Sequence, residues 1–577
     1  MPWRSSAAAA DSARRFRYHP VVTTPAQNRS LILWAVVLLV LSPVVFCEFT
    51  TWDDDSTVSR NSRLDPPTLA KVGYYWTHQA GSLYIPVTYT VWSVLAVGAR
   101  LQQRDVSGIV LNPMVFHAAN LLIHAGSAAL VMSILNRLTR NRDAALIGAL
   151  LFAIHPVQVE AVAWISGLKD LLWGFFSLAA IDLYLQVFSP AKEQAGAPVA
   201  GAFADNSATS PPFHLLKYLA GTVCVALAML SKPTAVMTPL IVVAMDRLLL
   251  VRPWKKIAIS AGPWIALSVP CAIIARVVQP GFAVQGDVPW ARPLVMLDSI
   301  AFYVGKLLWP ANLTPDYGHR PSNVVADGLL YWTWIVPAVL FAIAAWQFKR
   351  RRWIAAGLAV FILGTLPTIG LTSFSFQFFS TTADHYLYVS MLGVAIVVAF
   401  VLAQQKLTPP LIGACAVVLL ALAVRTFGQT AVWKDTDTVL KQMSTVNPRS
   451  FIAPYMLGQL EVDARHYAAA EPLLRRSLEM EPRYPRPHDA LAEVLLNTGR
   501  QTEAIPHIQQ FIKAVPNLNA EIAKRLESNH VNLGIYYAQH GDKPQAAHEF
   551  REALKLNPGD KTIEAMLKKC ETNEPDH

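Results

Sequence analysis

Charged residues and cysteines are scarce in this chain of 577 residues. Asp, Glu, Lys and Arg make up 15% of the sequence against 53% for hydrophobic residues, a balance that excludes an ordinary soluble protein. The five cysteines are scattered, without the paired spacing of a metal site or a disulfide framework. A glycine-rich phosphate loop and a nucleophile elbow are also missing. The nucleotide-binding and hydrolase classes that depend on those motifs are therefore not indicated.

The hydrophobic residues are gathered into long runs that contain few charges. A helix needs about 20 largely apolar residues to cross a bilayer. Eleven stretches approach that length: 31–47, 115–136, 143–158, 168–188, 214–230, 233–250, 257–278, 330–348, 353–372, 386–404 and 408–426. The sequence therefore predicts an all-α, polytopic membrane protein with about eleven spans.

Arginine and lysine gather in short connectors between these runs. Basic residues in short loops mark the cytoplasmic side of a membrane protein. With eleven spans, the clusters within 14–29, 137–142, 247–256 and 349–352 all fall on that side. The net charge of +10 therefore indicates topology, and we expect no nucleic acid partner.

The segments outside the spans divide the chain further. Residues 1–30 are expected to be a cytoplasmic tail, and the Pro/Gly/Ala/Ser-rich residues 189–213 a cytoplasmic linker. The first outer loop covers residues 48–114. Two more apolar stretches, 82–99 and 294–309, are expected to be helices lying along the outer face, because counting just one of them as a span would reverse the topology.

After residue 430 the chain changes to amphipathic helices with frequent charges. A period of about 34 residues, typical of tetratricopeptide repeats, gives copies near 451–484, 485–518 and 527–560. Small residues that let paired helices approach, and prolines that end helices, recur in the copies: Gly458, Ala470, Pro482, Ala504, Pro516, Gly534, Ala546 and Pro558. Residues 431–577 are therefore predicted to form a short solenoid. Its concave face could hold a peptide or protein, or the repeats could simply stabilise the membrane part.

Three adjacent carboxylates, Asp53, Asp54 and Asp55, follow the first apolar run and should lie at the outer membrane surface. Their repulsion should raise at least one pKa unless a cation is near, and carboxylates with unlike pKa values suit general-base catalysis. In an extended segment Asp53 and Asp55 would share one face. One carboxylate could take a proton while another orients the acceptor or holds a divalent metal such as Mg²⁺ or Mn²⁺. Acidic residues also occur beside spans without any catalytic role.

Other polar residues gather at the outer ends of the predicted spans. Cations facing carboxylates at the lipid surface are what a phosphate-bearing lipid substrate requires, because a leaving phosphate needs neutralisation. Any one of these residues could instead bond between helices or extend to the interface. The candidates for binding a donor or an acceptor are His155, Glu160, Lys169, Asp170, Lys232, Asp384, His385 and Tyr386.

A metal site is not identified by spacing. His117 and His124 lie on one face of the second predicted span, but no third ligand accompanies them. Packing therefore explains this pair better than metal binding.

Several short strings stand out together: Trp52-Asp53-Asp54-Asp55, Tyr84-Ile85-Pro86-Val87-Thr88-Tyr89, Phe116-His117-Ala118-Ala119-Asn120, His155 through Trp164, Lys169-Asp170, Ser231-Lys232-Pro233 and Asp384-His385-Tyr386-Leu387-Tyr388. In combination they resemble the transmembrane and tetratricopeptide-repeat-containing O-mannosyltransferase family and its bacterial relatives, which are GT-C glycosyltransferases. The resemblance extends over about residues 31–560. His385 stands where an arginine is common in that family.

The resemblance implies a GT-C-type helical membrane domain over residues 31–430. It also implies transfer of a sugar, mannose, from a polyprenyl-phosphate carrier to a protein Ser or Thr hydroxyl, with inversion at the anomeric carbon. Asp54, or its neighbour Asp53, would be the general base on the acceptor hydroxyl. Such a base contributes about 10²–10⁴-fold to a rate.

Two other classes are weighed against this enzyme. A non-catalytic membrane scaffold would use the repeats to assemble protein complexes, but one span would suffice to anchor it. A transporter would carry charged residues at midspan and an internal duplication of its membrane half. In this sequence Asp182 is the main carboxylate at midspan, and no such duplication is seen. The expected location is a bacterial inner membrane, with the repeats in the periplasm.

Overall fold

The computed structural model describes residues 25–572 except residues 82, 105–107, 190–211, 279–288 and 515–519. The described residues form helices and connecting turns, and they contain no β-strand beyond two isolated bridges. The all-α prediction is confirmed. Most of the predicted cytoplasmic tail and most of the predicted 189–213 linker lie outside the described residues.

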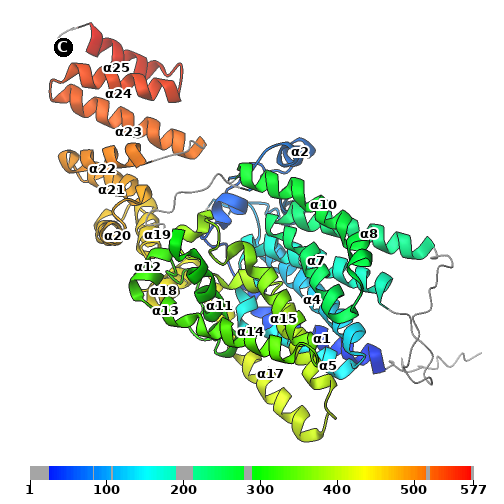
Figure 1. Cartoon of the computed structure of the whole chain (residues 1–577). Coiled ribbons are helices and arrows are strands. Elements are labelled where there is room, and N and C mark those ends of the chain that lie inside the picture. Colours follow the sequence, from blue (N-terminus) through cyan, green and yellow to red (C-terminus); the bar gives the residue numbers. More distant parts are fainter. Residues whose placement is uncertain are drawn as a thin grey trace, which may run out of the picture.

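The membrane part is a bundle of helices of unequal length (Figure 1). Its α-helices are α1 (Pro25–Leu41), α2 (Leu69–Thr77), α3 (Pro86–Gly98), α4 (Pro113–Thr139), α5 (Arg142–Ile154), α6 (Val159–Ala163), α7 (Leu168–Phe188), α8 (Pro212–Ser231), α9 (Thr238–Met245), α10 (Trp254–Val278), α11 (Arg292–Leu308), α12 (Pro321–Asp327), α13 (Leu330–Thr333), α14 (Ile335–Gln347), α15 (Arg352–Thr365), α16 (Met391–Ala403) and α17 (Pro409–Thr430).

Short helical turns of other types connect these helices. The 3₁₀ turns are η1 (Ser42–Phe46), η3 (Pro156–Gln158), η4 (Ile165–Gly167), η5 (Pro233–Met237), η7 (Pro289–Ala291), η8 (Leu366–Thr368), η9 (Ser375–Phe378), η10 (Asp384–Leu387) and η11 (Ala431–Trp433). Two more turns, η2 (Asp55–Ser59) and η6 (Asp246–Leu250), are π-helical. Such turns interrupt the regular hydrogen bonding of a helix and often mark functional sites.

Eight helical stretches of the described residues are long and apolar enough to cross a membrane. They are Asn28–Phe46, Pro113–Thr139, Ile165–Phe188, His214–Ser231, Pro233–Leu250, Trp254–Val278, Leu330–Gln347 and Pro409–Trp433. Each coincides with one of the eleven predicted stretches. The chain is therefore a multi-pass membrane protein.

The other three predicted spans contain broken or shorter helices. Over 143–158, α5 and the η3–α6 segment meet at an angle of 52°, because Pro156 has no N–H with which to continue α5. Counting this bent pair as one span gives nine. Within 353–372 and 386–404 the helices are the shorter α15 and α16. Polar residues of η10 occupy the chain before α16, so the regular helix begins only at Met391.

Helix ends meet at two opposite poles of the bundle. The start of α7, the end of α8 and η10 lie near the loop that carries Asp54, and we call this pole the aspartate end. The far ends of α4, α7 and α16 meet the start of α15, and we call that pole the basic end. The 21 residues of α7 rise about 30 Å, which matches the hydrocarbon core of a bilayer.

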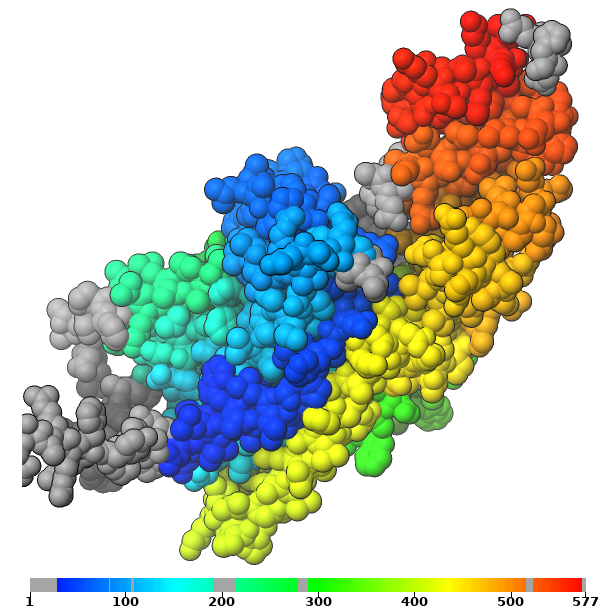
Figure 2. Space-filling model, turned by 180° about the vertical axis from the view of Figure 1, so that it is seen from behind, coloured from blue at the N-terminus to red at the C-terminus, as the bar shows by residue number. Residues whose placement is uncertain are grey.

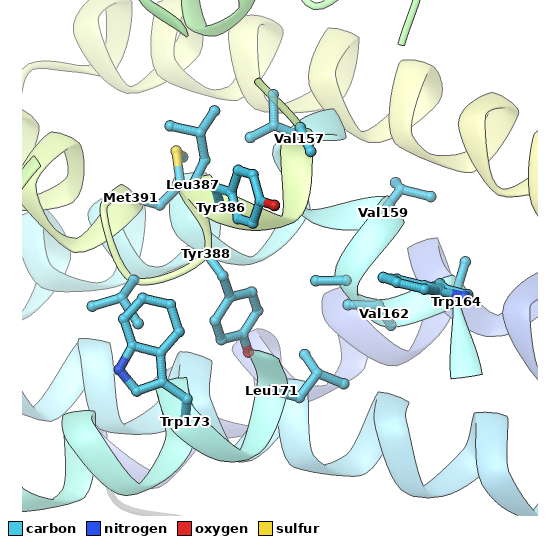
Figure 3. Close-up of a cluster of buried hydrophobic side chains, with 14 of the residues drawn as sticks. Val157, Val159, Val162, Trp164, Leu171, Trp173, Tyr386, Leu387, Tyr388 and Met391 are labelled. Atoms are coloured by element: carbon cyan, nitrogen blue, oxygen red, sulfur yellow. The ribbon is translucent and has the colours of Figure 1, made fainter. Parts of the chain in front are cut away.

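A continuous hydrophobic core fills the centre of the bundle. Figure 3 shows Tyr388, next to η10, directed toward the helix that carries Leu171 and Trp173, with Val157, Val159 and Val162 on the neighbouring broken segment. The ring of Tyr388 fits because residue 174 on α7 is a glycine, whose absent Cβ would collide with it. The broken segment is therefore packed inside the bundle, and its polar side chains are buried with it.

The tail forms antiparallel helix pairs stacked in sequence order (Figure 1). Its helices are α18 (Thr436–Val446), α19 (Ile452–Asp463), α20 (Tyr467–Met480), α21 (Pro485–Asn497), α22 (Gln501–Ala514), α23 (Ala520–Gln539), α24 (Lys543–Leu556) and α25 (Lys561–Glu571). A Cβ on Gly458 would lie 2.9 Å from Leu474 Cδ2, and one on Gly534 would lie 2.6 Å from Phe550 Cε1. These glycines therefore allow the close helix pairing that the repeat pattern predicts.

Close packing of α15 against α16 generates a first prediction. A Cβ on Gly393 would collide with the carbonyl oxygen of Gly357 and lie 2.7 Å from the backbone nitrogen of Phe361. Neither of these atoms can move aside as a flexible side chain could, because both belong to the backbone. We expect Gly393→Ala to lower the free energy of unfolding by roughly 1–3 kcal/mol. Thermal unfolding of the purified protein in detergent, followed by tryptophan fluorescence, measures this loss.

Gly413→Ala in α17 is the matched control, since a Cβ there meets no atom within 4 Å. Alanine is the better helix former, so we expect an unchanged or slightly raised melting temperature for the control. Equal melting temperatures for the two variants would contradict the close backbone contact.

Candidate active site

The aspartate end is organised by one fully buried carboxylate, that of Asp54. Its Oδ2 accepts hydrogen bonds from the Thr50 N–H at 3.0 Å and the Thr50 hydroxyl at 2.9 Å. Its Oδ1 accepts from the Ser166 N–H at 2.9 Å and the Ser166 hydroxyl at 2.7 Å. Asp54 thus joins the first outer loop to η4, which precedes α7. Both of its oxygens are engaged by the protein itself.

Burial raises the pKa of Asp54 to about 7, although these four hydrogen bonds oppose the shift. The sequence predicted that at least one carboxylate of the trio would have a raised pKa, and the surroundings of Asp54 raise its pKa. Its cause differs from the expected one, because desolvation and not repulsion by the neighbouring aspartates produces it.

Further contacts fix the same loop on the bundle. The Trp164 indole N–H donates to the Trp52 carbonyl at 2.6 Å. The hydroxyls of Thr57 and Ser166 lie 2.7 Å apart, and the Thr57 hydroxyl lies 2.7 Å from the Asp53 carbonyl. The segment is therefore a tight turn leading into η2, not an extended strand.

Asp53 is the exposed member of the trio and has an unusual backbone conformation. Its φ of 74° lies in the left-handed region, which aspartate tolerates better than most residues but which still costs free energy. The contacts of Trp52 and Asp54 on either side hold it there. Its negative charge acts on His385, Tyr386 and Tyr89. The Asp53 side chain is therefore open to solvent and close to the buried cluster described next.

The side chain of Asp55 bonds within the helical turn that this residue begins. It is the first residue of η2, and its Oδ1 accepts a hydrogen bond from the Ser56 N–H at 2.7 Å. The three carboxylates therefore have three different surroundings: Asp54 is buried, Asp53 is exposed, and Asp55 bonds to the next residue within the turn that it begins.

Glu160 and His385 form a buried pair at the centre of the site. The His385 backbone N–H donates to Glu160 Oε2 at 3.1 Å, and His385 Nδ1 lies 2.9 Å from Glu160 Oε1. Burial lowers the pKa of His385 to about 3, so its imidazole is neutral at physiological pH. The pair joins α6 to η10.

A second buried pair links α7 to the end of α8. Lys232 Nζ lies 2.5 Å from Asp170 Oδ1, and it also lies 5.3 Å from the centre of the Tyr386 ring. Lys169 Nζ lies 4.3 Å from the ring of Trp164. The site therefore contains two lysines within a shell of aromatic rings.

The remaining candidates fall on either side of this centre. Asp384 accepts a hydrogen bond from the Tyr317 hydroxyl at 2.8 Å, and burial together with the charge of Glu160 raises its pKa well above the usual value. His155 instead caps η3 and places its Nε2 3.1 Å from the Leu307 carbonyl oxygen. These contacts of His155 are structural, whereas Asp384 borders the cluster.

Three buried polar atoms in this region have no hydrogen-bond partner among the described residues. Both amide atoms of Gln158 and the Oδ2 atom of Asp170 are buried without a hydrogen bond. Buried polar groups are normally satisfied. These atoms therefore indicate a site that receives water or a polar ligand.

The acidic trio does not fit a divalent metal. Asp54 offers no free oxygen, and Asp53 and Asp55 have different surroundings. No group of three or more His, Cys, Asp or Glu side chains in the described part of the chain is arranged around a common point. His124 bonds to the Ala153 carbonyl and the Tyr388 hydroxyl, so it is a packing residue.

An apolar pocket of about 180 Å³ opens beside Lys232. Its walls come from α8, η5 and α10, together with Tyr84 of the outer loop. They include Met229, Leu230, Pro233 and Cys271.

Sequence reasoning did not assign roles to Thr50, Thr57, Gln158 and Ser166. Hydroxyl and amide side chains are common everywhere, and the pairing of Ser166 with Asp54 is a contact across 112 residues of the chain. Gln158 lies within one of the short strings that stood out, whereas Thr50, Thr57 and Ser166 lie outside them.

The Asp54 carboxylate generates a second prediction. An asparagine there would present an NH₂ group to donors that need an acceptor, so we expect Asp54→Asn to destabilise the fold by about 1–3 kcal/mol. Because the folded pKa lies above the usual value of 3.8, the native state of the parent binds the extra proton. Protonation of Asp54 therefore contributes to the free energy of unfolding of the parent protein. This contribution is fully present below about pH 4 and is lost as the pH rises toward 7.

Urea or thermal unfolding of both proteins between pH 4 and pH 8 measures this effect. The variant should lack that contribution, whereas Thr51→Ser, which leaves the Asp54 carboxylate and its four hydrogen bonds in place, should retain it. An identical pH dependence for the parent and Asp54→Asn would contradict the buried, titrating carboxylate.

Comparison with known proteins gives matches to both parts of the chain. The tetratricopeptide repeat family matches residues 455–519 and 528–560, so the repeat prediction is confirmed. Protein O-mannosyl-transferase TMTC3 of Mus musculus is 23% identical over 561 residues, which cover 89% of this chain and 58% of the relative. Protein O-mannosyl-transferase TMTC1 of Homo sapiens is 25% identical over 454 residues, which cover 70% of this chain and 46% of the relative.

A third relative, protein O-mannosyl-transferase F38B6.6 of Caenorhabditis elegans, is 22% identical over 70% of this chain and 54% of its own length. The chain thus spans about half the length of the curated relatives that it matches. It is a multi-pass membrane protein with tetratricopeptide repeats, similar over most of its length to the protein O-mannosyl-transferases of the TMTC group.

Proposed function

We propose that the chain is a membrane glycosyltransferase that moves a sugar, mannose, from a polyprenyl-phosphate carrier to a protein Ser or Thr hydroxyl. Its relatives are named protein O-mannosyl-transferases, which supports O-mannosyl transfer. The observation that carries the proposal is the geometry of Asp53, an exposed carboxylate fixed at φ 74° beside a buried cluster of charges. Strain of this kind persists where the surroundings over-determine it, and it is frequent at active sites.

Asp53 is the general base in this proposal. It would take the proton of the acceptor hydroxyl as that oxygen attacks the anomeric carbon and the bond to the carrier phosphate breaks. A base must reach the substrate, and Asp53 is the member of the trio whose carboxylate is open. Asp54 cannot serve in this way, since four protein donors enclose it. Asp54 is a positioning residue that holds Asp53 in its turn.

The lysines would neutralise the departing carrier phosphate. Lys232 and Lys169 are the cations of the cluster, and His385, which stands where the family commonly has arginine, is neutral. Charge stabilisation of a leaving group is strongest in a buried, preorganised site. Asp170 Oδ1 forms an ion pair with Lys232 Nζ at 2.5 Å, which compensates the charge of this lysine.

The donor lipid would lie in the apolar pocket beside Lys232. Pro233 and Leu230 line that pocket, so a prenyl chain there would have its phosphate at the lysine. Asp170 Oδ2 and the amide of Gln158, which lack protein partners, are available to sugar hydroxyls. Glu160 and Asp384 would position the residues around the site. Glu160 does so through its contact with His385, and Asp384 through the hydrogen bond from Tyr317.

The acceptor would reach Asp53 from the side of the repeat domain. The Thr51 N–H donates to the Thr436 hydroxyl at 3.1 Å, so the loop of the trio touches the first helix of the tail. Arg320 joins the two parts through an ion pair with Glu481 at 2.8 Å. In Figure 2 the repeats (orange to red) rise beside the outer loop (blue), with an open notch between them. An acceptor peptide in that notch would lie next to the site.

Contact between the trio and the tail supports one aqueous compartment for both. Basic connectors gather at the opposite pole, the pole expected to face the cytoplasm. We therefore propose that the site and the repeats face the periplasm of a bacterial inner membrane.

Asp53→Asn generates the third prediction. Asparagine also tolerates the left-handed region, so the turn should survive while the base is lost. We expect transfer to fall by about 10²–10⁴-fold with little change in melting temperature. The assay uses purified protein, polyprenyl-phosphate [¹⁴C]mannose and a mixture of Ser/Thr peptides in proteoliposomes.

Glu48→Gln is the matched control, because Glu48 is an exposed acid of the same loop and lies outside the cluster. We expect full transfer from this variant. Normal transfer by Asp53→Asn would remove the base assignment. Peptide binding without any transfer by the parent protein would favour the non-catalytic scaffold instead.

A further inference from the structure

A large cavity lies at the basic end, far from the aspartate trio. It has a volume of about 960 Å³ and is formed by the ends of α4, α7, η6 and α16 and by the starts of α5 and α15. Six cationic side chains line it, and none of its lining residues is acidic: Arg137, Arg140, Arg142, Lys349, Arg350 and Arg352. From the sequence alone these residues indicate only topology.

Most of this positive charge is not compensated by the described part of the chain. Arg137 is paired with Asp182 at 2.9 Å, an acid that is also held by Ser133 and Gln186. The other five cations form no ion pair with a described acid. Like charges brought together around a concave surface raise its potential and attract anions.

The same cavity has apolar walls. Leu248, Leu249 and Leu250 of η6 line it, and so do Trp353 and Phe400, whose rings stack at 5.9 Å. A free phosphate ion would use the cations but would gain nothing from these walls. An amphipathic molecule with a phosphate head and hydrocarbon chains would use both.

Two strained backbone positions shape the cavity. Val251, at the end of the π-helical turn η6, has a φ of 57°, and Arg140, at the end of α4, has a φ of 55°. A β-branched residue in the left-handed region is a marked outlier. Buried Asp246 holds η6 through the Tyr184 hydroxyl and through Arg252 at 2.7 Å. The wall is therefore built and fixed by its own buried contacts.

We propose that this cavity binds the headgroup of an anionic phospholipid, with the acyl chains running along the apolar wall. It lies where the helices end at the bilayer surface, the depth at which phospholipid phosphates are found. Five cations without an ion pair to a described acid exceed the charge of one phosphate, so a two-phosphate lipid such as cardiolipin fits best. The site is separate from the donor site, because the length of α7 lies between them.

Lipid titration of the full-length protein tests the proposal. Detergent-purified protein is titrated with cardiolipin, phosphatidylglycerol, phosphatidylcholine and inorganic phosphate, and native mass spectrometry and thermal unfolding report binding. We expect cardiolipin to bind most tightly and phosphatidylglycerol next, each raising the melting temperature. Phosphatidylcholine should have little effect. If inorganic phosphate stabilises as well as cardiolipin does, the cavity is a simple anion site and the proposal is overturned.

Two charge variants assign the binding to this cavity. Arg142→Gln with Arg350→Gln removes two exposed lining cations and should weaken cardiolipin binding by about tenfold or more. Arg351→Gln with Lys406→Gln is the matched control, since both residues are exposed at the same pole but line no part of the cavity. Equal losses in the two double variants would show a general surface attraction and would overturn the site. Mannose transfer is not needed for this readout, so the outcome is independent of the proposed activity.

Discussion

The aspartate end depends on one buried carboxylate with four donors. Asp54 connects the first outer loop to the segment that precedes α7. Burying an ionisable group is costly unless hydrogen bonds compensate it. Thr50 and Ser166 each provide a backbone N–H and a hydroxyl, so both carboxylate oxygens are hydrogen-bonded, and burial still raises the pKa of Asp54 to about 7. With Asp54 satisfied in this way, Asp53 can remain exposed and strained beside the cluster.

The three aspartates of the trio have different structural roles. A single aspartate could not be both buried as an anchor and open to a substrate. Asp54 serves as the anchor, Asp55 begins the π-helical turn, and Asp53, which precedes both, adopts the left-handed conformation. The broken third span has a similar consequence, because the bend at Pro156 brings Glu160 into the core, where it meets His385.

Much of this fold was predictable from composition and periodicity. Long apolar runs and the repeat spacing predict helices and their order, since both depend on local patterns. The candidate residues Glu160, Lys169, Asp170, Lys232 and His385 were predicted as a group, and the structure brings them together. Which aspartate is exposed could not be predicted, because the answer lies in a contact with Ser166, 112 residues away. The cavity at the basic end could not be predicted either, since the connectors that form it are far apart in the chain.

The hydrophobic core does not stop where the membrane helices stop. Trp433 stacks with Trp164 at 6.3 Å, and Phe451 of the tail packs against Phe378 and Phe379 of the membrane part. The first repeat and the bundle therefore form one cooperative folding unit. During synthesis the bundle emerges first, and this part of its core is completed only when residues 433–451 join it. Truncation before residue 433 would therefore leave Trp164, Phe378 and Phe379 without the aromatic partners that the tail supplies.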